Sequence, residues 1–194
     1  MRFLPLLILV LSACADAPSV VPERDAEADR LLAFVSGDAW DDAWKASEGA
    51  FTQRVDGSQT VLDSVHNPLP AFLSDEPPYL DASARDQYTT RVIGDTLVAG
   101  QSARLVEARF VADSRRTQPI RYVRAAVSPE AGELLAVVVQ REMASALFDE
   151  TSQLRAELAS GARGLVPGSA RIDARTDVPL SDARVSTVQW QRAQ

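Results

Sequence analysis

The sequence predicts an α+β domain in which a short helical region precedes a long antiparallel β meander. Apolar residues recur at helical spacing in residues 28–50, whereas from Phe51 onward apolar and polar residues alternate in short runs. Glycine-containing pairs such as Asp56-Gly57 separate these runs and suit tight hairpin turns. With 194 residues, 46% of them hydrophobic and 24% charged, the chain fits one domain, which we expect to span residues 28–194.

The first residues, 1–13, have the pattern of a bacterial lipoprotein signal peptide. Arg2 gives a positive start, and residues 3–11 form an apolar run too short to cross a bilayer as a mature helix. The run leads into Leu11-Ser12-Ala13-Cys14, which resembles a lipobox. We therefore expect Cys14, the single cysteine, to be lipidated and to attach the protein to a membrane. The alternatives are an ordinary signal peptide with a chance cysteine, or a buried core thiol.

The residue after the cysteine bears on where the lipidated protein resides. By resemblance to lipoproteins of bacteria with two membranes, an aspartate there retains the protein at the inner membrane, and this chain has Ala15. We expect anchoring in the outer membrane, facing the periplasm, with the inner membrane as the alternative. Loss of Arg2 leaves 19 basic and 27 acidic residues, a net charge of −8 that does not favour an anionic surface. The lipid, and no basic patch, is expected to hold the protein.

Between the anchor and the first strand, the sequence predicts a tether followed by two helical pieces. Residues 14–27 combine prolines and charges without an apolar period, which is typical of a flexible tether. Residues 28–50 carry an apolar stripe that includes Trp40 and Trp44. Gly37 is expected to divide this region into two helices.

The remainder predicts strands joined mostly by short turns. Asp56-Gly57 and Gly94-Asp95 are expected two-residue turns, and residues 128–132 a longer one with proline near its start and glycine at its end. Residues 134–139 are apolar on both faces, so we expect the helices to cover one side of the sheet. The expected strands are residues 51–55, 58–62, 87–93, 96–99, 103–112, 121–127, 133–141, 146–158, 170–175 and 183–191.

The stretch 67–81 interrupts this meander. Its four prolines cannot donate ladder hydrogen bonds, which predicts a loop. The loop also holds apolar residues, among them Phe72 and Tyr79, and a loop with this much apolar surface usually packs as a lid over a core or a groove.

Several segments resemble the superfamily of outer-membrane lipoprotein carriers and receptors, which includes sensors that regulate the envelope stress sigma factor. They are Phe51-Thr52-Gln53, the stretch 95–108 with its turn, glycine and alternating strand, and the hairpin strands 122–127 and 134–141. The resemblance implies a curved, open antiparallel half-barrel with helices packed over its mouth. It also implies an apolar concave surface that accepts acyl chains or a lipoprotein.

Composition argues against several other functions. The net charge of −7 does not suit nucleic acid as a partner, and one cysteine and one histidine exclude the usual zinc sites. His66 lies near Ser64, but no nucleophile-elbow motif is present, so we expect a loop histidine and no enzyme. The acidic residues at 38, 41 and 42 lack a calcium-loop pattern and fit a helix start, with Asp38 as its cap. We expect no metal and no cofactor.

Two functional hypotheses follow. In the first, a monomeric half-barrel binds a lipid, an acyl chain or a lipoprotein segment on its concave wall. In the second, the barrel is filled by its own side chains, and an edge strand pairs with an envelope protein as an interaction or sensor module. An apolar cavity favours the first hypothesis and a packed interior the second. The predicted ligand-binding residues are Val106, Phe110, Val123, Val127, Val137 and Val139 in the wall, with Trp40, Trp44, Phe72 and Tyr79 in the lid.

Overall fold

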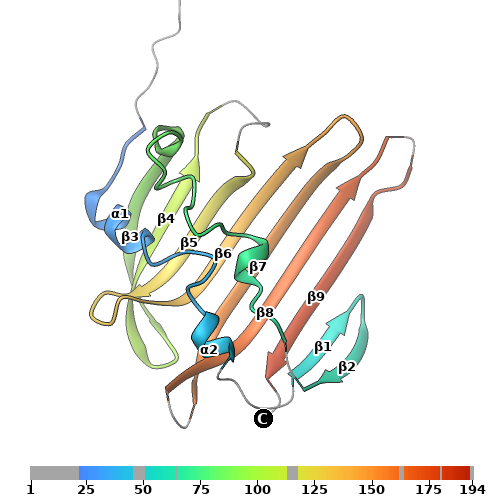
Figure 1. Ribbon diagram of the computed structural model, residues 1–194, viewed down its shortest axis with the longest axis horizontal. Helices are drawn as coiled ribbons and strands as arrows, with labels where there is room; N and C mark the ends of the chain where they lie inside the picture. Colours follow the sequence, from blue (N-terminus) through green and yellow to red (C-terminus); the bar gives the residue numbers. More distant parts are fainter. Residues whose placement is uncertain are drawn as a thin grey trace, which may run out of the picture.

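The computed structural model describes residues 22–45, 51–63, 65–112, 118–161, 164–179 and 181–192. These residues form one antiparallel sheet of nine strands, with two short helices and a long loop on one face (Figure 1). The helices are α1 (Ala26–Leu32) and α2 (Asp41–Lys45), and the loop contains 3-10 turns at Leu69–Ala71 and Arg85–Gln87. The strands are β1 (Phe51–Val55), β2 (Ser58–Leu62), β3 (Tyr88–Val98), β4 (Gln101–Phe110), β5 (Ile120–Ser128), β6 (Glu133–Ala144), β7 (Asp149–Gly161), β8 (Gly164–Asp177) and β9 (Arg184–Arg192).

The strand order in the sheet is β2-β1-β9-β8-β7-β6-β5-β4-β3. From β3 to β9 each strand lies beside its neighbour in sequence, as expected for a meander with short connections. The hairpin of β1 and β2 departs from this order because β1 pairs with β9, where Phe51 lies opposite Arg192. Strands β2 and β3 therefore form the two edges, and the sheet stays open. The predicted α+β fold, a curved open half-barrel with N-terminal helices over it, is confirmed.

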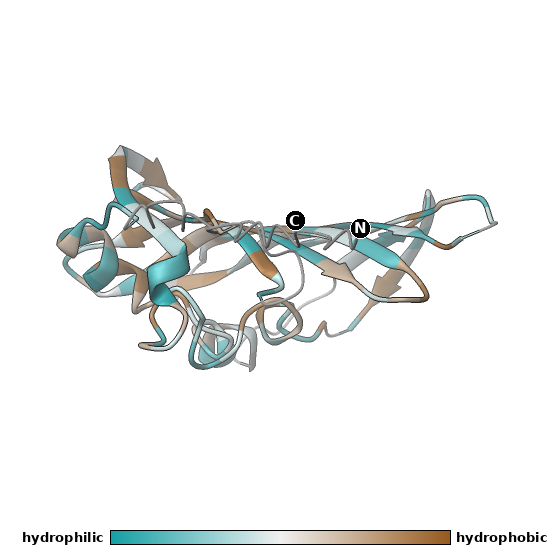
Figure 2. Cartoon of the chain, turned by 90° about the horizontal axis from the view of Figure 1, so that it is seen from above, coloured by the Kyte–Doolittle hydropathy of each residue, from teal (hydrophilic) through white to brown (hydrophobic). Residues whose placement is uncertain are grey.

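The two faces of the sheet have different surroundings. Residues directly opposite one another on paired strands place their side chains on the same face. The row of Val106, Ala125, Val137, Ala156 and Ala170 across β4 to β8 is buried, and we call this side the inner face. The helices and the loop lie to this one side of the sheet (Figure 2). The alternate residues form the outer face.

Helix α1 begins at a side-chain cap. The Asp25 carboxylate accepts hydrogen bonds from the backbone amides of Glu27, at 2.8 Å, and Ala28, at 3.2 Å, which satisfies two donors that the first turn leaves open. The helix packs against β3 and β4 and buries Ala28, Leu31 and Leu32 completely. Residues 46–50, the end of the predicted second helix, lie outside the described residues.

The proline-rich loop forms the rest of the covering layer. Its apolar residues Leu69, Phe72, Leu73 and Tyr79 all belong to the main core, so the loop packs as the predicted lid over that core. On β6, the Arg141 guanidinium donates from Nη1 to the Ala71 carbonyl and lies 5.8 Å from the centre of the Phe72 ring. Arginine on the sheet thus contributes to holding the loop against the sheet.

Strand β3 is longer than the sequence predicted. The expected turn at Gly94-Asp95 is wrong, because β3 continues through these residues with a β-bulge between Val92 and Gly94. The chain turns instead at Ala99 and Gly100, whose φ values of 51° and 79° are both positive. Such a pair forms the two-residue turn that matches the twist of an antiparallel hairpin, with the alanine accepting the strained position.

The N-terminal segment covers part of the β3 edge. The amide of Asp25 donates to the Thr90 carbonyl at 3.1 Å, and the amide of Thr90 donates to the Glu23 carbonyl at 3.2 Å. The Arg24 guanidinium bonds to Asp29 at 2.8 Å and to the Tyr79 carbonyl at 3.0 Å. The last residues of the predicted tether are therefore part of the folded structure.

Candidate functional site

The inner face brings together every residue that the sequence assigned to a ligand-binding wall and lid. Nine of the ten side chains are buried in one core cluster, and Phe110 is partly buried against the same cluster. In the described residues the wall is packed against the lid. Ligand binding by these ten residues stays a prediction.

Polar atoms of the covering layer have partners within that core. Trp40 donates from Nε1 to the Leu134 carbonyl at 2.6 Å, and Tyr79 donates from its hydroxyl to the Val35 carbonyl at 2.8 Å. Tyr88 donates to the Ile120 carbonyl, also at 2.8 Å. Burial raises the pKa of the Tyr79 and Tyr88 hydroxyls above the ordinary value, so both stay neutral donors. The Trp40 bond ties the covering layer to β6, the Tyr79 bond joins the loop to the segment after α1, and the Tyr88 bond joins β3 to β5 within the sheet.

The outer face carries a row of arginines that the sequence alone did not bring together. Strand register places Arg91 opposite Glu107 and Glu107 opposite Arg124, so their side chains share this face. In the next row, Arg109 lies opposite Tyr122. We call Arg91, Arg109 and Arg124, together with Glu107 and Tyr122, the arginine cluster. The Arg91 row continues across the sheet through Val138, Arg155, Arg171, Gln189 and Arg54.

Glu107 organises the arginine cluster. Its side chain is 3% exposed, and it accepts hydrogen bonds from Arg91 Nε at 2.5 Å, from the Tyr122 hydroxyl at 3.0 Å and from Arg124 Nη2 at 3.4 Å. Arg109 and Arg124 each lie over the Tyr122 ring, with 5.4 and 5.6 Å between the guanidinium carbon and the ring centre. One carboxylate and one ring therefore orient three arginines.

The charges within the arginine cluster do not cancel. Burial alone raises the pKa of the Glu107 carboxyl, but hydrogen bonds from Arg91 and Tyr122 outweigh it and hold that pKa below its usual value. Glu107 is therefore ionised at neutral pH and supplies one negative charge against three guanidinium groups. The side chains of Arg91 and Arg124 are 65% and 45% exposed, so their remaining donors reach solvent.

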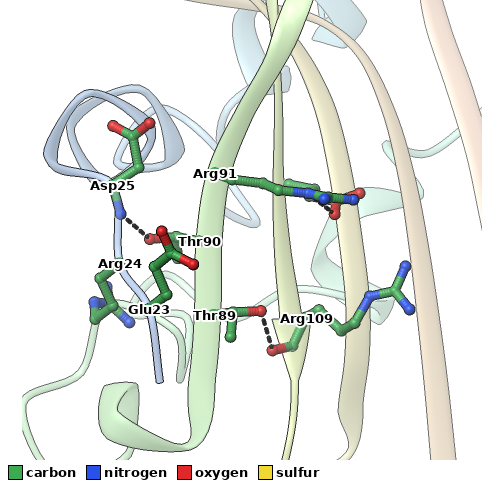
Figure 3. A pocket seen from close by; sticks show the side chains of 8 residues that line it. Glu23, Arg24, Asp25, Thr89, Thr90, Arg91 and Arg109 are labelled. Atoms are coloured by element: carbon green, nitrogen blue, oxygen red, sulfur yellow. Dashed lines mark hydrogen bonds and ion pairs between the residues drawn. The ribbon is translucent and has the colours of Figure 1, made fainter. Parts of the chain in front are cut away.

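A hollow of about 800 Å³ lies where this cluster meets the edge of the sheet. Figure 3 shows Arg91 and Arg109 projecting from β3 and β4 on one side and the chain of Glu23, Arg24 and Asp25 running along β3 on the other. Thr89 donates to the Arg109 carbonyl at 3.4 Å at its base. The lining holds the acidic side chains of Glu23, Asp25 and Glu107 beside the basic ones of Arg24, Arg91 and Arg109, so it suits a polar group better than an acyl chain.

The other residues that the sequence singled out lie apart from this cluster. His66 is exposed in the loop, and Ser64 beside it is outside the described residues. In the described ranges, no three His, Cys, Asp or Glu side chains come together as a metal site, and no helix is long and apolar enough to span a membrane. Cys14 also lies outside the described residues, so its lipidation stays a prediction.

Comparisons with known proteins give a weak structural likeness. No protein-family model and no curated protein matches the chain. The chain is similar to a solved structure described as the complex of MucA and MucB from Pseudomonas aeruginosa, with a TM-score of 0.32 and 10% sequence identity. The match covers 87% of this chain and 94% of that chain. A likeness at this level assigns no family, and the family resemblance expected from the sequence stays a prediction.

Proposed function

We propose that this protein is a non-enzymatic lipoprotein of the bacterial envelope, attached by Cys14 to the periplasmic side of the outer membrane. Its folded domain is an interaction module that accepts a strand of a partner protein at the β2 edge. The signal-peptide pattern before Cys14 supports the anchor. The filled inner face supports a module that binds through its surface, because the side chains of the predicted wall and lid already pack against one another.

The difference between the two sheet edges carries this proposal. At the β3 edge, Thr90 already exchanges backbone hydrogen bonds with Glu23 and Asp25. The described residues provide no such cover for β2, which is the terminal strand of the sheet order. Its sequence, Ser58-Gln59-Thr60-Val61-Leu62, contains neither charge nor proline, which are the usual devices that block pairing at an edge. Val61 is 63% exposed and extends the apolar contact available to a partner.

The hairpin geometry identifies the backbone groups that a partner strand would use. Val55 and Ser58 flank the two-residue turn and form a hydrogen-bonded pair, and such pairs alternate along the ladder. The amide and carbonyl groups of Gln59 and Val61 therefore point away from β1. A partner strand can bond to them without disturbing the existing hairpin.

A photo-crosslinking residue at position 59 tests this arrangement in cells that make the full chain. We expect a crosslinked partner that disappears in Val61→Pro, because proline removes one outward amide, and that persists in Val61→Thr. Proline is tolerated where the amide faces solvent, so Val61→Pro should melt at the temperature of the parent. A crosslink that survives in folded Val61→Pro, or its absence from position 59, would contradict the proposal. A crosslinker at Leu147, which is 75% exposed, controls for random encounters.

A second candidate is binding of an apolar ligand under the lid. One observation favours it: part of the cover over the inner face is the proline-rich loop, and a loop can be displaced more readily than a sheet. Phe110, which is only partly buried, would be the first wall residue that a ligand reaches. Replacing Phe110 by Asp should then abolish uptake of lipid from vesicles, and unchanged uptake by a folded variant would exclude this placement.

A further inference from the structure

We propose that the arginine cluster on the outer face docks the domain onto phosphate groups of lipid headgroups in the membrane that holds its anchor. This inference rests on the proposed lipidation of Cys14 and is independent of strand pairing at β2. It assigns a binding surface to Arg91, Arg109 and Arg124.

The guanidinium groups of the cluster keep donors available for a phosphate. Arg91 uses Nε for Glu107 and Arg124 uses Nη2, which leaves the other nitrogens of each fork open to a ligand. Among the described residues, no carboxylate lies within 4.0 Å of the Arg109 guanidinium, which contacts the Tyr122 ring. Arginine forks bind phosphate oxygens in pairs of parallel hydrogen bonds. Because Glu107 and Tyr122 already orient the forks, binding costs less side-chain freedom than it would for isolated arginines.

The tether brings the membrane to this surface. The described chain begins at Pro22, and the next residues, Glu23, Arg24 and Asp25, line the same hollow as Arg91 and Arg109. Eight residue steps separate Pro22 from Cys14, and at most about 3.6 Å per step they span no more than about 29 Å. The cluster therefore lies within a short tether of the lipid. Because the tether keeps this surface near the membrane, it meets lipid headgroups at a high effective concentration. A freely diffusing acidic protein lacks this advantage.

Charge complementarity favours the same orientation. Without Arg2 the chain has 19 basic and 27 acidic residues, so an anionic membrane repels its net charge of −8. The cluster sets three arginines against one carboxylate, and the row beyond it adds Arg155, whose guanidinium has only the Gln153 side chain as a hydrogen-bond partner among the described residues. The face that carries these arginines is therefore the one that we expect to turn toward the membrane. The attraction acts within about 8 Å at physiological salt, so contact is required.

Arginine modification in the lipidated full chain tests the docking directly. The protein is placed on vesicles of phosphatidylcholine, or of an equal mixture of phosphatidylcholine and phosphatidylglycerol, and treated with phenylglyoxal. Peptide mass spectrometry then gives the rate at each arginine. We expect Arg91 and Arg109 to react about fivefold more slowly on the anionic vesicles, the ratio given by about 1 kcal/mol per basic side chain, and to recover in high salt. Arg175 and Arg184, on the far strands β8 and β9, should react equally on both vesicles.

A matched pair of variants shows whether the arginine cluster causes this protection. Arg109→Gln removes a guanidinium with no carboxylate partner among the described residues, so the fold should persist while Arg91 loses protection. Arg184→Gln should leave that protection unchanged. Equal rates for Arg91 and Arg109 on both vesicles would overturn the proposal, as would equal effects of the two variants.

Two further measurements distinguish lipid headgroups from other ligands and test the anchor itself. Protection of the cluster by inorganic phosphate without vesicles would reassign it to a free phosphate ligand, and protection by polyglutamate alone would reassign it to an acidic protein. The mass of the N-terminal peptide reports acylation of Cys14 independently. An unacylated Cys14 would refute the anchor and remove the basis of the docking, whereas an acylated Cys14 without protection would refute the docking alone.

Discussion

The lid hydroxyl of Tyr79 offers a sharp test of whether the inner face is closed. Tyr79 is completely buried, and its hydroxyl donates to the carbonyl of Val35, which is also completely buried. Replacing Tyr79 by Phe keeps the ring and its edge contact with Tyr88, whose centre is 6.1 Å away. The substitution therefore removes one buried hydrogen bond while leaving the aromatic packing in place.

The expected loss of stability comes from the Val35 carbonyl, which keeps no hydrogen-bond donor in Tyr79→Phe. In a closed structure the Val35 carbonyl has no water to replace the lost donor, and an unsatisfied buried polar group costs about 1 to 3 kcal/mol. Ser160→Ala is the matched control, because Ser160 donates to the Ala99 carbonyl at 2.7 Å but is exposed. Water replaces its hydroxyl, so that variant should change the free energy of unfolding by no more than about 0.5 kcal/mol.

Urea unfolding of the two variants and the parent measures both values. We expect Tyr79→Phe to lower the midpoint clearly and to leave the slope with denaturant unchanged, since the same surface is exposed on unfolding. If Tyr79→Phe costs no more than Ser160→Ala, water reaches the Val35 carbonyl and the lid is open in solution. That result would refute the closed inner face and favour the ligand-binding hypothesis.

Two further changes test the arginine cluster and a hairpin turn. Glu107→Gln should lower the free energy of unfolding at neutral pH by about 1 to 2 kcal/mol, because the carboxylate is buried although its arginines are partly exposed. Since the folded pKa of Glu107 is lowered, its contribution is complete above the unfolded pKa of about 4.3 and is lost as the pH falls through the folded pKa. Urea titrations across that acid range should show a smaller loss in Glu107→Gln than in the parent, and parallel curves would contradict this role. Gly132→Ala places a methyl group 2.8 Å from Phe34 Cε1 at a φ of 65° and should cost more than Gly57→Ala, which has a φ of 88° and no atom within 4 Å. Both variants share a backbone cost of about 1 to 2 kcal/mol, and equal melting temperatures would show that the Phe34 ring moves aside freely.

Local sequence signals predicted most of the secondary structure. The hairpin around Asp56-Gly57 and the strands β5 and β6 match the expected ranges closely, because turn chemistry and alternation act within a few residues. The four prolines in residues 67–81 likewise predicted the loop that follows β2. The turn after β3 was missed because an alanine occupies one of its positive-φ positions, and Gly94 marked a bulge instead.

Non-local pairing explains what the sequence could not provide. Nothing near Phe51 indicates that β1 pairs with β9, because that contact joins segments from the two ends of the sheet domain. The arginine cluster was hidden for the same reason: Arg91 and Arg124 become neighbours of Glu107 only through the register of three strands. Net charge averages over the whole chain and conceals such a cluster. The alternation of each strand gives the face of a residue, but only the register gives its neighbours.

Native mass spectrometry of the full chain, purified from membranes in mild detergent, tests the central claim most directly. Because wall and lid fill the inner face together, the protein should carry no tightly bound lipid apart from the acyl chains covalently attached at Cys14. Denaturation should then leave its mass unchanged. A stoichiometric lipid that is present in the native spectrum and lost on denaturation would contradict the filled inner face. It would also identify the ligand for which the lid opens.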